Sequence, residues 1–229
     1  MRRTPPLAWA LGAIVFDCDG TLLDSERHWE EARERVMRAH GAASDPAFAR
    51  AVKGLHYDEC GRRMALALGR PALAGHLTGQ LLDVFRELTA GTPTVLPGAR
   101  ELVERLSGSL PLAVASNCPR DIVVTGLTQA GLLRWFDHIV VPEGSDRPKP
   151  RPDVYLEAAR RCGVPPGQTL AVEDSVCGML AAARAGLRVL AVGPGLRDND
   201  GDLVDLWVES LADTDLLAWA GGVERPVAC

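Results

Sequence analysis

Two aspartates separated by a single residue are the first feature of this sequence that could do chemistry. Asp17 and Asp19 stand at the end of a short apolar run, and Gly20 follows them directly. Carboxylates placed in this way can both project toward one pocket, and a glycine here permits a tight turn whose backbone N–H groups face an anion. Taken alone, the motif is explained equally well by a turn in which aspartate accepts hydrogen bonds from its own backbone.

Three further polar motifs follow other apolar runs. Ser116 and Asn117 supply a hydroxyl and an amide, and Lys149 stands between two prolines. Glu173 and Asp174 form an acidic pair. Each motif has an ordinary explanation by itself, such as a helix cap or a solvated lysine. Together they supply carboxylates for a hard divalent cation, a hydroxyl and one fixed positive charge, and Mg2+ prefers such oxygen ligands.

The apolar runs before these motifs predict the elements that must position them. Each run is short, continuous rather than alternating, and rich in Val, Ile, Leu and Ala, which is typical of a parallel strand covered on both faces. Helical patterns lie between the runs, so the sequence predicts an α/β fold, a three-layer Rossmann-like sandwich with a parallel sheet. The carboxyl ends of such strands share one edge, where ligands bind. The predicted strands are residues 13–16, 112–115, 138–141, 170–172 and 189–192, and the predicted helices include residues 98–106, 152–161 and 177–185.

A helical segment interrupts this alternation. Residues 25–92 contain no convincing strand, and glycine-containing turns divide them into helical patterns. The sequence therefore predicts two domains: residues 1–24 and 93–229 form the α/β core, and residues 25–92 form a helical cap inserted after the first strand. The predicted cap helices are residues 25–40, 45–53, 58–68 and 73–90, and residues 90–97 form a linker back to the sheet.

The composition argues against some classes of partner. The 229 residues carry a formal net charge of −5 and no long run of Lys or Arg, so we expect no nucleic-acid partner. Mixed charges over residues 30–35, which include Arg33, predict a solvated helix face. The six cysteines form no C-x-x-C pair and are expected to be free thiols in a reducing compartment.

The apolar start of the chain favours a strand over a targeting segment. The run from Leu7 to Phe16 is too short to span a bilayer, ends at Asp17, and is followed by no small-residue cleavage site. We therefore expect a buried first strand, a cytoplasmic protein with no membrane partner, and a monomer or weak dimer. The tail after Gly221 is expected to be mobile.

The order of the four motifs resembles a known superfamily. D-x-D-G-T, S-N, K-P-x-P-D and E-D-S follow one another across essentially the whole chain. In this the chain resembles the haloacid dehalogenase (HAD) superfamily, in the branch (subfamily I) whose helical C1 cap follows the first strand. The resemblance implies a Mg2+-dependent phosphomonoester hydrolase that acts on a small phosphorylated metabolite, expected to be a sugar phosphate, through an aspartyl phosphate. The true dehalogenases lack the second aspartate, so its presence favours phosphate chemistry.

The resemblance also implies roles for individual residues. Asp17 matches the nucleophile, and Asp19 matches the general acid/base, whose backbone carbonyl also contacts the metal. Asp17 and Asp174 would bind the metal directly. Glu173 would act through a bound water or from outside the set of direct ligands. Cys18 should point away from the pocket into the core. The implied phosphate-binding residues are Gly20, Thr21, Ser116, Asn117 and Lys149.

The cap is expected to supply the remaining substrate contacts. The principal candidates are His28, Lys53, His56 and Arg62, with Glu26 also considered. Trp29 and Tyr57 are candidates too, although a role in the cap core is favoured for both.

Three functions stay open at this point. The first is a phosphatase, and the second is a β-phosphoglucomutase-like isomerase that uses the same aspartyl phosphate. The core motifs do not separate these two, because the difference lies in whether the cap holds a second phosphate; Lys53 is placed where a mutase could hold one. The third is a catalytically silent binding protein, which would have lost the nucleophile, the acid or Lys149, and all are present.

Overall fold

The computed structural model describes residues 9–43, 46–144, 146–194 and 203–223. Within them lies a parallel sheet with strand order β3-β2-β1-β4-β5-β6. The strands are β1 (Ala13–Phe16), β2 (Leu112–Ala115), β3 (His138–Val140), β4 (Thr169–Glu173), β5 (Arg188–Val192) and β6 (Leu206–Val208). This confirms the predicted α/β class and all the predicted strands. It adds β6, whose short length gave no separate apolar run.

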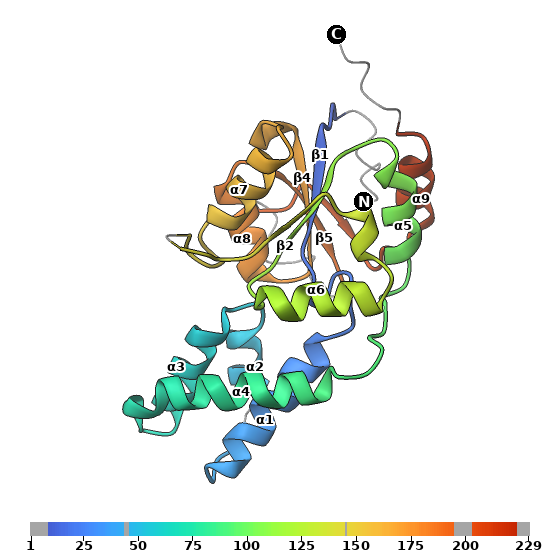
Figure 1. Cartoon of the computed structure of the whole chain (residues 1–229). Helices are drawn as coiled ribbons and strands as arrows, with labels where there is room; N and C mark the ends of the chain where they lie inside the picture. The colour runs from blue at the N-terminus through green and yellow to red at the C-terminus, as the bar shows by residue number, and fades with distance from the viewer. Residues whose placement is uncertain (1–8, 44–45, 145, 195–202, 224–229) are drawn as a thin grey trace.

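Helices cover both faces of the sheet, which gives the predicted three layers (Figure 1). One face carries α7, which packs on β1, β2 and β3, and α8, which packs on β4 and β5; the other carries α5, α6 and α9. Alternate strand residues serve the two sides, so Ile14 and Phe16 belong to one apolar cluster and Val15 belongs to the other. The bounds of these helices are α5 (Ala99–Ser107), α6 (Arg120–Gln129), α7 (Asp153–Arg161), α8 (Val176–Arg184) and α9 (Thr214–Gly221).

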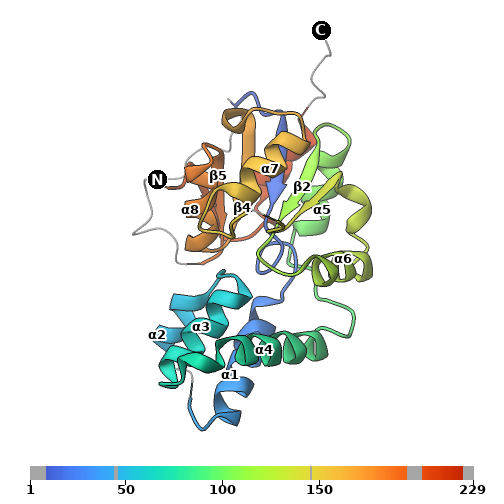
Figure 2. The ribbon, with the colours of Figure 1, turned by 60° about the vertical axis from the view of Figure 1, so that its left-hand side comes forward.

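The predicted cap segment is helical, and its helices gather beyond one end of the sheet (Figures 1 and 2). They are α1 (Glu26–Ala39), α2 (Pro46–Val52), α3 (Tyr57–Ala67) and α4 (Ala74–Leu88), with a 3-10 turn at Pro71–Leu73. Helix α4 packs on both α1 and α3, and the Trp29 and Phe85 rings stack with centroids 3.7 Å apart. The division at residues 24/25 and 92/93 stays a prediction.

The first strand is buried, as expected, because all four residues of β1 lie in the interior. The described cysteines are free. Among the described residues, no helix combines the length and the apolar character needed to cross a membrane. The predicted mobile tail after Gly221 falls mostly on residues 224–229, which lie outside the described residues, as do residues 1–8 of the apolar start.

Candidate active site

The strand register explains why motifs far apart in sequence converge. Phe16 at the end of β1 pairs with Val114 of β2 on one side and with Val172 of β4 on the other. The next residue, Asp17, continues this alignment, since its backbone N–H donates to the Val172 carbonyl at 2.9 Å. Asp17 therefore stands level with the ends of β2 and β4, and the motifs that follow these strands meet at one edge of the sheet.

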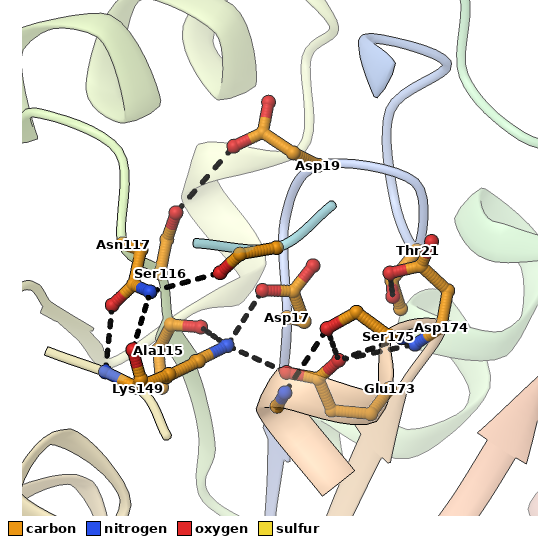
Figure 3. Close-up of polar contacts among 12 residues, drawn as sticks. Asp17, Asp19, Thr21, Ala115, Ser116, Asn117, Lys149, Glu173, Asp174 and Ser175 are labelled. Carbon is orange, nitrogen blue, oxygen red and sulfur yellow. Dashed lines mark hydrogen bonds and ion pairs between the residues drawn. The ribbon is translucent and has the colours of Figure 1, made fainter. Parts of the chain in front are cut away.

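Lys149 is the centre of a buried polar network at this edge (Figure 3). Its Nζ donates to Asp17 Oδ1 at 2.6 Å, to Glu173 Oε1 at 2.6 Å and to the Ala115 carbonyl at 2.8 Å. The Tyr155 hydroxyl donates to the same Glu173 oxygen at 2.7 Å. An ammonium has three donors, and here each has an acceptor, so the orientation of Lys149 is fixed.

The charges in this network shift one another's pKa values. Burial raises the pKa of Asp17 well above its ordinary value, and Lys149 opposes that shift. Burial also disfavours the charged form of Lys149, but the carboxylates of Asp17 and Glu173 outweigh it and hold the pKa of Lys149 well above its ordinary value. Lys149 is thus a permanent cation beside Asp17.

Asp19 lies beside this network, on the far side of Ser116 (Figure 3). It accepts hydrogen bonds from the Ser25 hydroxyl at 2.5 Å and from the Ser116 hydroxyl at 3.5 Å. Burial raises the pKa of Asp19, and hydrogen bonds from Ser25 and Trp29 oppose the shift. The two aspartates of the first motif therefore face different surroundings.

An acidic cluster with the dimensions of a cation site lies between β1 and β4. Asp17, Glu173 and Asp174 are all buried, and one carboxylate oxygen of each lies within 4.8 Å of the others. Glu173 Oε1 already accepts from Lys149 and Tyr155, and Oε2 accepts from Asp174 N, Ser175 N and Ser175 Oγ. The residues fit Mg2+, with Asp17 and Asp174 as the carboxylates better placed for direct binding.

The turn after Asp19 is shaped by the approach of Asp174. Gly20 has φ of 88°, and a Cβ at this position would lie 2.3 Å from Asp174 Oδ2. Its N–H donates to the Leu23 carbonyl at 2.8 Å, so the prediction that this N–H faces the phosphate needs correction. The Thr21 hydroxyl donates to Asp174 Oδ1 at 3.5 Å, which ties the turn to β4.

Asn117 also differs from the prediction. Its side-chain Nδ2 donates to the carbonyls of Gly54 and Lys149, at 2.9 and 3.2 Å, and its Oδ1 accepts from Lys149 N at 2.9 Å. The amide therefore joins the cap to the Lys149 loop instead of presenting a free group to phosphate. Ser116 and Lys149 remain the predicted phosphate-binding side chains that point toward Asp17 and Asp19.

The turn between α2 and α3 brings the cap against the core. Lys53 Nζ pairs with Asp174 Oδ2 at 2.7 Å. Gly54 has φ of 73°, and a Cβ there would lie 2.6 Å from Ser175 Oγ, so a larger residue would push the turn away. The pocket between this turn and the aspartates has about 40 Å³ of free space, enough for a few water molecules.

The other predicted cap contacts lie in three different places. Glu26, Trp29 and Tyr57 line the pocket with Asp17 and Asp19. His28 instead lines a second cavity of about 350 Å³ near the linker to the sheet.

Two predicted contacts have local roles within the cap. His56 caps α3, since its Nδ1 accepts from Asp58 N at 3.3 Å. Arg62 pairs with Glu59 on the surface at 2.8 Å. The structure thus does not bring His28, His56 or Arg62 to the pocket that contains Asp17.

Tyr155 and Arg33 are among the residues of the site that were not predicted. Tyr155 of α7 is fully buried against Glu173. Arg33 lines the pocket and is 3% exposed, so its predicted place on a solvated face is wrong. The signal for Arg33 was its spacing, because it falls on the same helical stripe as Trp29, Val36 and Met37.

Comparisons with known proteins identify the family of the chain. A model of the haloacid dehalogenase-like hydrolases matches residues 11–186, and the chain belongs to this family. It is 33% identical over 178 residues to validoxylamine A 7'-phosphate phosphatase of Streptomyces hygroscopicus subsp. limoneus, covering 76% of this chain and 81% of that relative. It is 31% identical over 213 residues to hexitol phosphatase B of Escherichia coli K12, covering 90% of this chain and 94% of that relative.

The fold is shared with a solved structure. A β-phosphoglucomutase from Clostridium difficile superposes with a TM-score of 0.79 at 20% identity, covering 89% of this chain and 93% of that one. At this identity the likeness concerns the fold alone. With the family match and the phosphatase relatives, the enzyme class is settled: the chain is a HAD-like phosphatase.

Proposed function

We propose that this phosphatase hydrolyses a sugar or polyol phosphate through a phosphate ester formed on Asp17. The observation that carries the proposal is the contact of Lys149 Nζ with Asp17 Oδ1 at 2.6 Å, at the edge where Asp19 and Ser116 also meet. Lys149 holds one oxygen of the carboxylate, so we assign the attack on phosphorus to Oδ2. The names of the hexitol and validoxylamine phosphate phosphatases support the choice of substrate class.

Asp19 would move the protons in both halves of the reaction. In the first half, Asp17 attacks phosphorus, the bond from phosphorus to the leaving oxygen breaks, and Asp19 gives that oxygen a proton. In the second half, Asp19 takes a proton from water as the water oxygen attacks phosphorus. The bond from phosphorus to the Asp17 oxygen breaks, which frees inorganic phosphate and restores the Asp17 carboxylate. The raised pKa of Asp19 supports its starting as the acid.

Magnesium is the expected cofactor. Asp17 and Asp174 would hold it directly, together with the Asp19 backbone carbonyl, and Glu173 would act through water. When bound, the ion supplies positive charge between the Asp17 carboxylate and the phosphate, two anions that otherwise repel each other. Excess chelator should stop turnover and added Mg2+ should restore it; full activity in chelator would remove the metal from the proposal.

The cap must move for turnover, because the space beneath it holds only a few waters. The contacts of Lys53 and Gly54 with the core would break and form again in each cycle, excluding water from the transferring phosphoryl group when the cap is closed.

A panel of phosphorylated metabolites tests the function, with free phosphate and isomerised product measured in the same samples. We expect sugar and polyol phosphates to give free phosphate. Isomer without phosphate release would establish the mutase alternative in its place.

The cellular setting is also part of the proposal. Free cysteines among the described residues support a reducing, cytoplasmic location. Among the described residues, the exposed large apolar side chains are Leu66, Leu156 and Val176. They lie on three different helices, which supports a monomer or weak dimer. Light scattering after size exclusion would test the oligomeric state.

A further inference from the structure

The pocket next to Asp19 contains a buried ion pair that the proposed chemistry does not use. Arg33 Nη2 lies 3.0 Å from Glu26 Oε1, both residues belong to α1, and their side chains are 3% and 17% exposed. Both line the same pocket as Asp17 and Asp19. A buried pair of this kind is weak as a source of stability, because apolar residues of similar volume serve as well. Its place beside Asp17 and Asp19 therefore indicates a role in binding the substrate.

The hydrogen bonding of this pair is incomplete. A guanidinium carries five N–H donors, and among the described residues Arg33 Nε is buried without a partner. Buried donors are nearly always paired in native proteins, and those that are not call for an explanation. A ligand that enters the pocket with hydroxyl groups would supply the missing acceptors.

The charges around the pocket limit which ligands fit. Of the described residues that line it, the cations are Arg33 and Lys53. Each already faces a carboxylate, Glu26 at 3.0 Å and Asp174 at 2.7 Å. With the cap closed as in this structure, a second phosphate or a carboxylate on the substrate would find both cations paired and would meet Glu26 as well. A hydroxyl, which both donates and accepts, suits a paired Glu and Arg.

We propose that the Glu26–Arg33 pair binds hydroxyl groups of the leaving alcohol, so that the enzyme selects polyol monophosphates without a second anionic group. This rests on the proposed phosphatase function and narrows its substrate class. Glu26 accepts from the hydroxyls and Arg33 donates to them. The ring of Trp29, which stacks on Phe85 and hydrogen-bonds to Asp19, provides an apolar wall. The same arrangement disfavours a mutase, because a mutase must hold a bisphosphate.

Two substrates that differ at one carbon test the proposal. Hexitol 6-phosphate and 6-phosphogluconate have chains of equal length, but the second ends in a carboxylate. We expect the wild-type kcat/KM to be at least about tenfold higher for the hexitol phosphate. An equal or higher value for 6-phosphogluconate would overturn the exclusion of a second anion.

Variants of Glu26 and Arg33 then test the pair itself. The reference substrate is 4-nitrophenyl phosphate, whose leaving group carries no further hydroxyl groups. Glu26→Gln should lower the ratio of kcat/KM for hexitol phosphate to that for the aryl phosphate by about 30-fold, mainly through KM. Glu34→Gln is the matched control on the exposed side of α1, where Glu34 pairs with Arg38. It should leave the ratio unchanged.

A double variant keeps the test valid if the single one folds poorly. Replacing both partners with methionine removes the charges together, which a core usually tolerates, and it should lower the ratio at least as much. An unchanged ratio in the folded double variant would refute the role of the pair. If the wild-type enzyme fails to release phosphate even from the aryl ester, the proposed function itself fails. If it releases phosphate but the substitutions leave the kcat/KM ratio unchanged, only this inference fails.

Discussion

The two buried ion networks of this enzyme differ in how complete they are. At the sheet edge, each of the three donors of Lys149 has an acceptor. The Tyr155 hydroxyl donates to Glu173 and forms the fourth hydrogen bond of this network. In the cap, Arg33 contacts Glu26 through Nη2, while its Nε has no partner among the described residues. The complete network holds the carboxylate of Asp17, the proposed nucleophile, in place before any ligand arrives. The incomplete one leaves hydrogen-bonding capacity for a ligand to fill.

The largest expected effect follows from removing the proposed nucleophile, the Asp17 carboxylate of the complete network. Asp17→Asn keeps the shape of the side chain but removes the nucleophile, so turnover of an aryl phosphate should fall by at least about a thousandfold. Asp24→Asn, an exposed residue of the same segment, serves as the control and should stay within about twofold of wild type. Activity like wild type in Asp17→Asn would exclude Asp17 as the nucleophile.

The stability of the two networks can be compared directly. Lys149→Met leaves two buried carboxylates without their cation, so the free energy of unfolding should fall by about 3–5 kcal/mol. Arg33→Met should cost less, roughly 1–2 kcal/mol, because Glu26 is partly exposed and can take up a proton. Urea unfolding without Mg2+ measures both. An equal loss in the two variants would contradict the difference between the networks.

The cap network should also give stability a pH dependence. Burial raises the pKa of Glu26 to about 7, although Arg33 and Lys53 lower it and Asp174 raises it. The folded state therefore binds a proton more tightly than the unfolded state, whose glutamate has a pKa near 4.3. The contribution is fully present below that value and is lost as the pH rises through about 7.

Comparison with a variant isolates this contribution. Relative to Glu26→Gln, wild type should lose roughly 1–3 kcal/mol of unfolding free energy between pH 5 and pH 8. Chemical unfolding at the two pH values measures it. A constant difference between the two proteins would show that Glu26 does not titrate in this range.

The smallest effect on stability is expected at the surface cluster of Glu157, Arg160 and Arg161, which serves as a reference for both buried networks. Hydrogen bonds from Arg160 and Arg161 lower the pKa of Glu157 to about 2. The contribution to stability is present above the unfolded pKa near 4.3 and is lost as the pH falls through about 2. Because the cluster is solvated, Glu157→Gln should lower Tm by less than about 2 °C at pH 7. A larger shift would mean that surface pairs contribute as much as the buried ones.

The sheet and the main site could be predicted because their signals are local. Continuous apolar runs mark buried parallel strands, and each polar motif follows such a run directly. The register then forces Asp17, Ser116 and Glu173 to one edge. β6 and α6 gave weaker signals, since β6 has three residues and α6 contains the β-branched run Ile122–Thr125.

The details of the cap could not be predicted, because they depend on pairing across elements. Arg33 was assigned to a solvated face from its charged neighbours, but packing of α1 on α4 buries its stripe. The amide of Asn117 binds the Gly54 carbonyl, a contact between residues 63 positions apart that no local pattern encodes. The Gly20 N–H likewise has a partner within its own turn, which only the folded geometry reveals.

The most direct test of the account is to trap the phosphoenzyme. The wild-type enzyme is mixed with a substrate carrying radioactive phosphate in the presence of Mg2+, quenched in acid within one turnover, and digested for peptide mapping. We predict label on the peptide that contains Asp17, removed by hydroxylamine and absent in Asp17→Asn. Label on a different residue, or rapid phosphate release with no labelled protein at any quench time, would contradict an ester on Asp17.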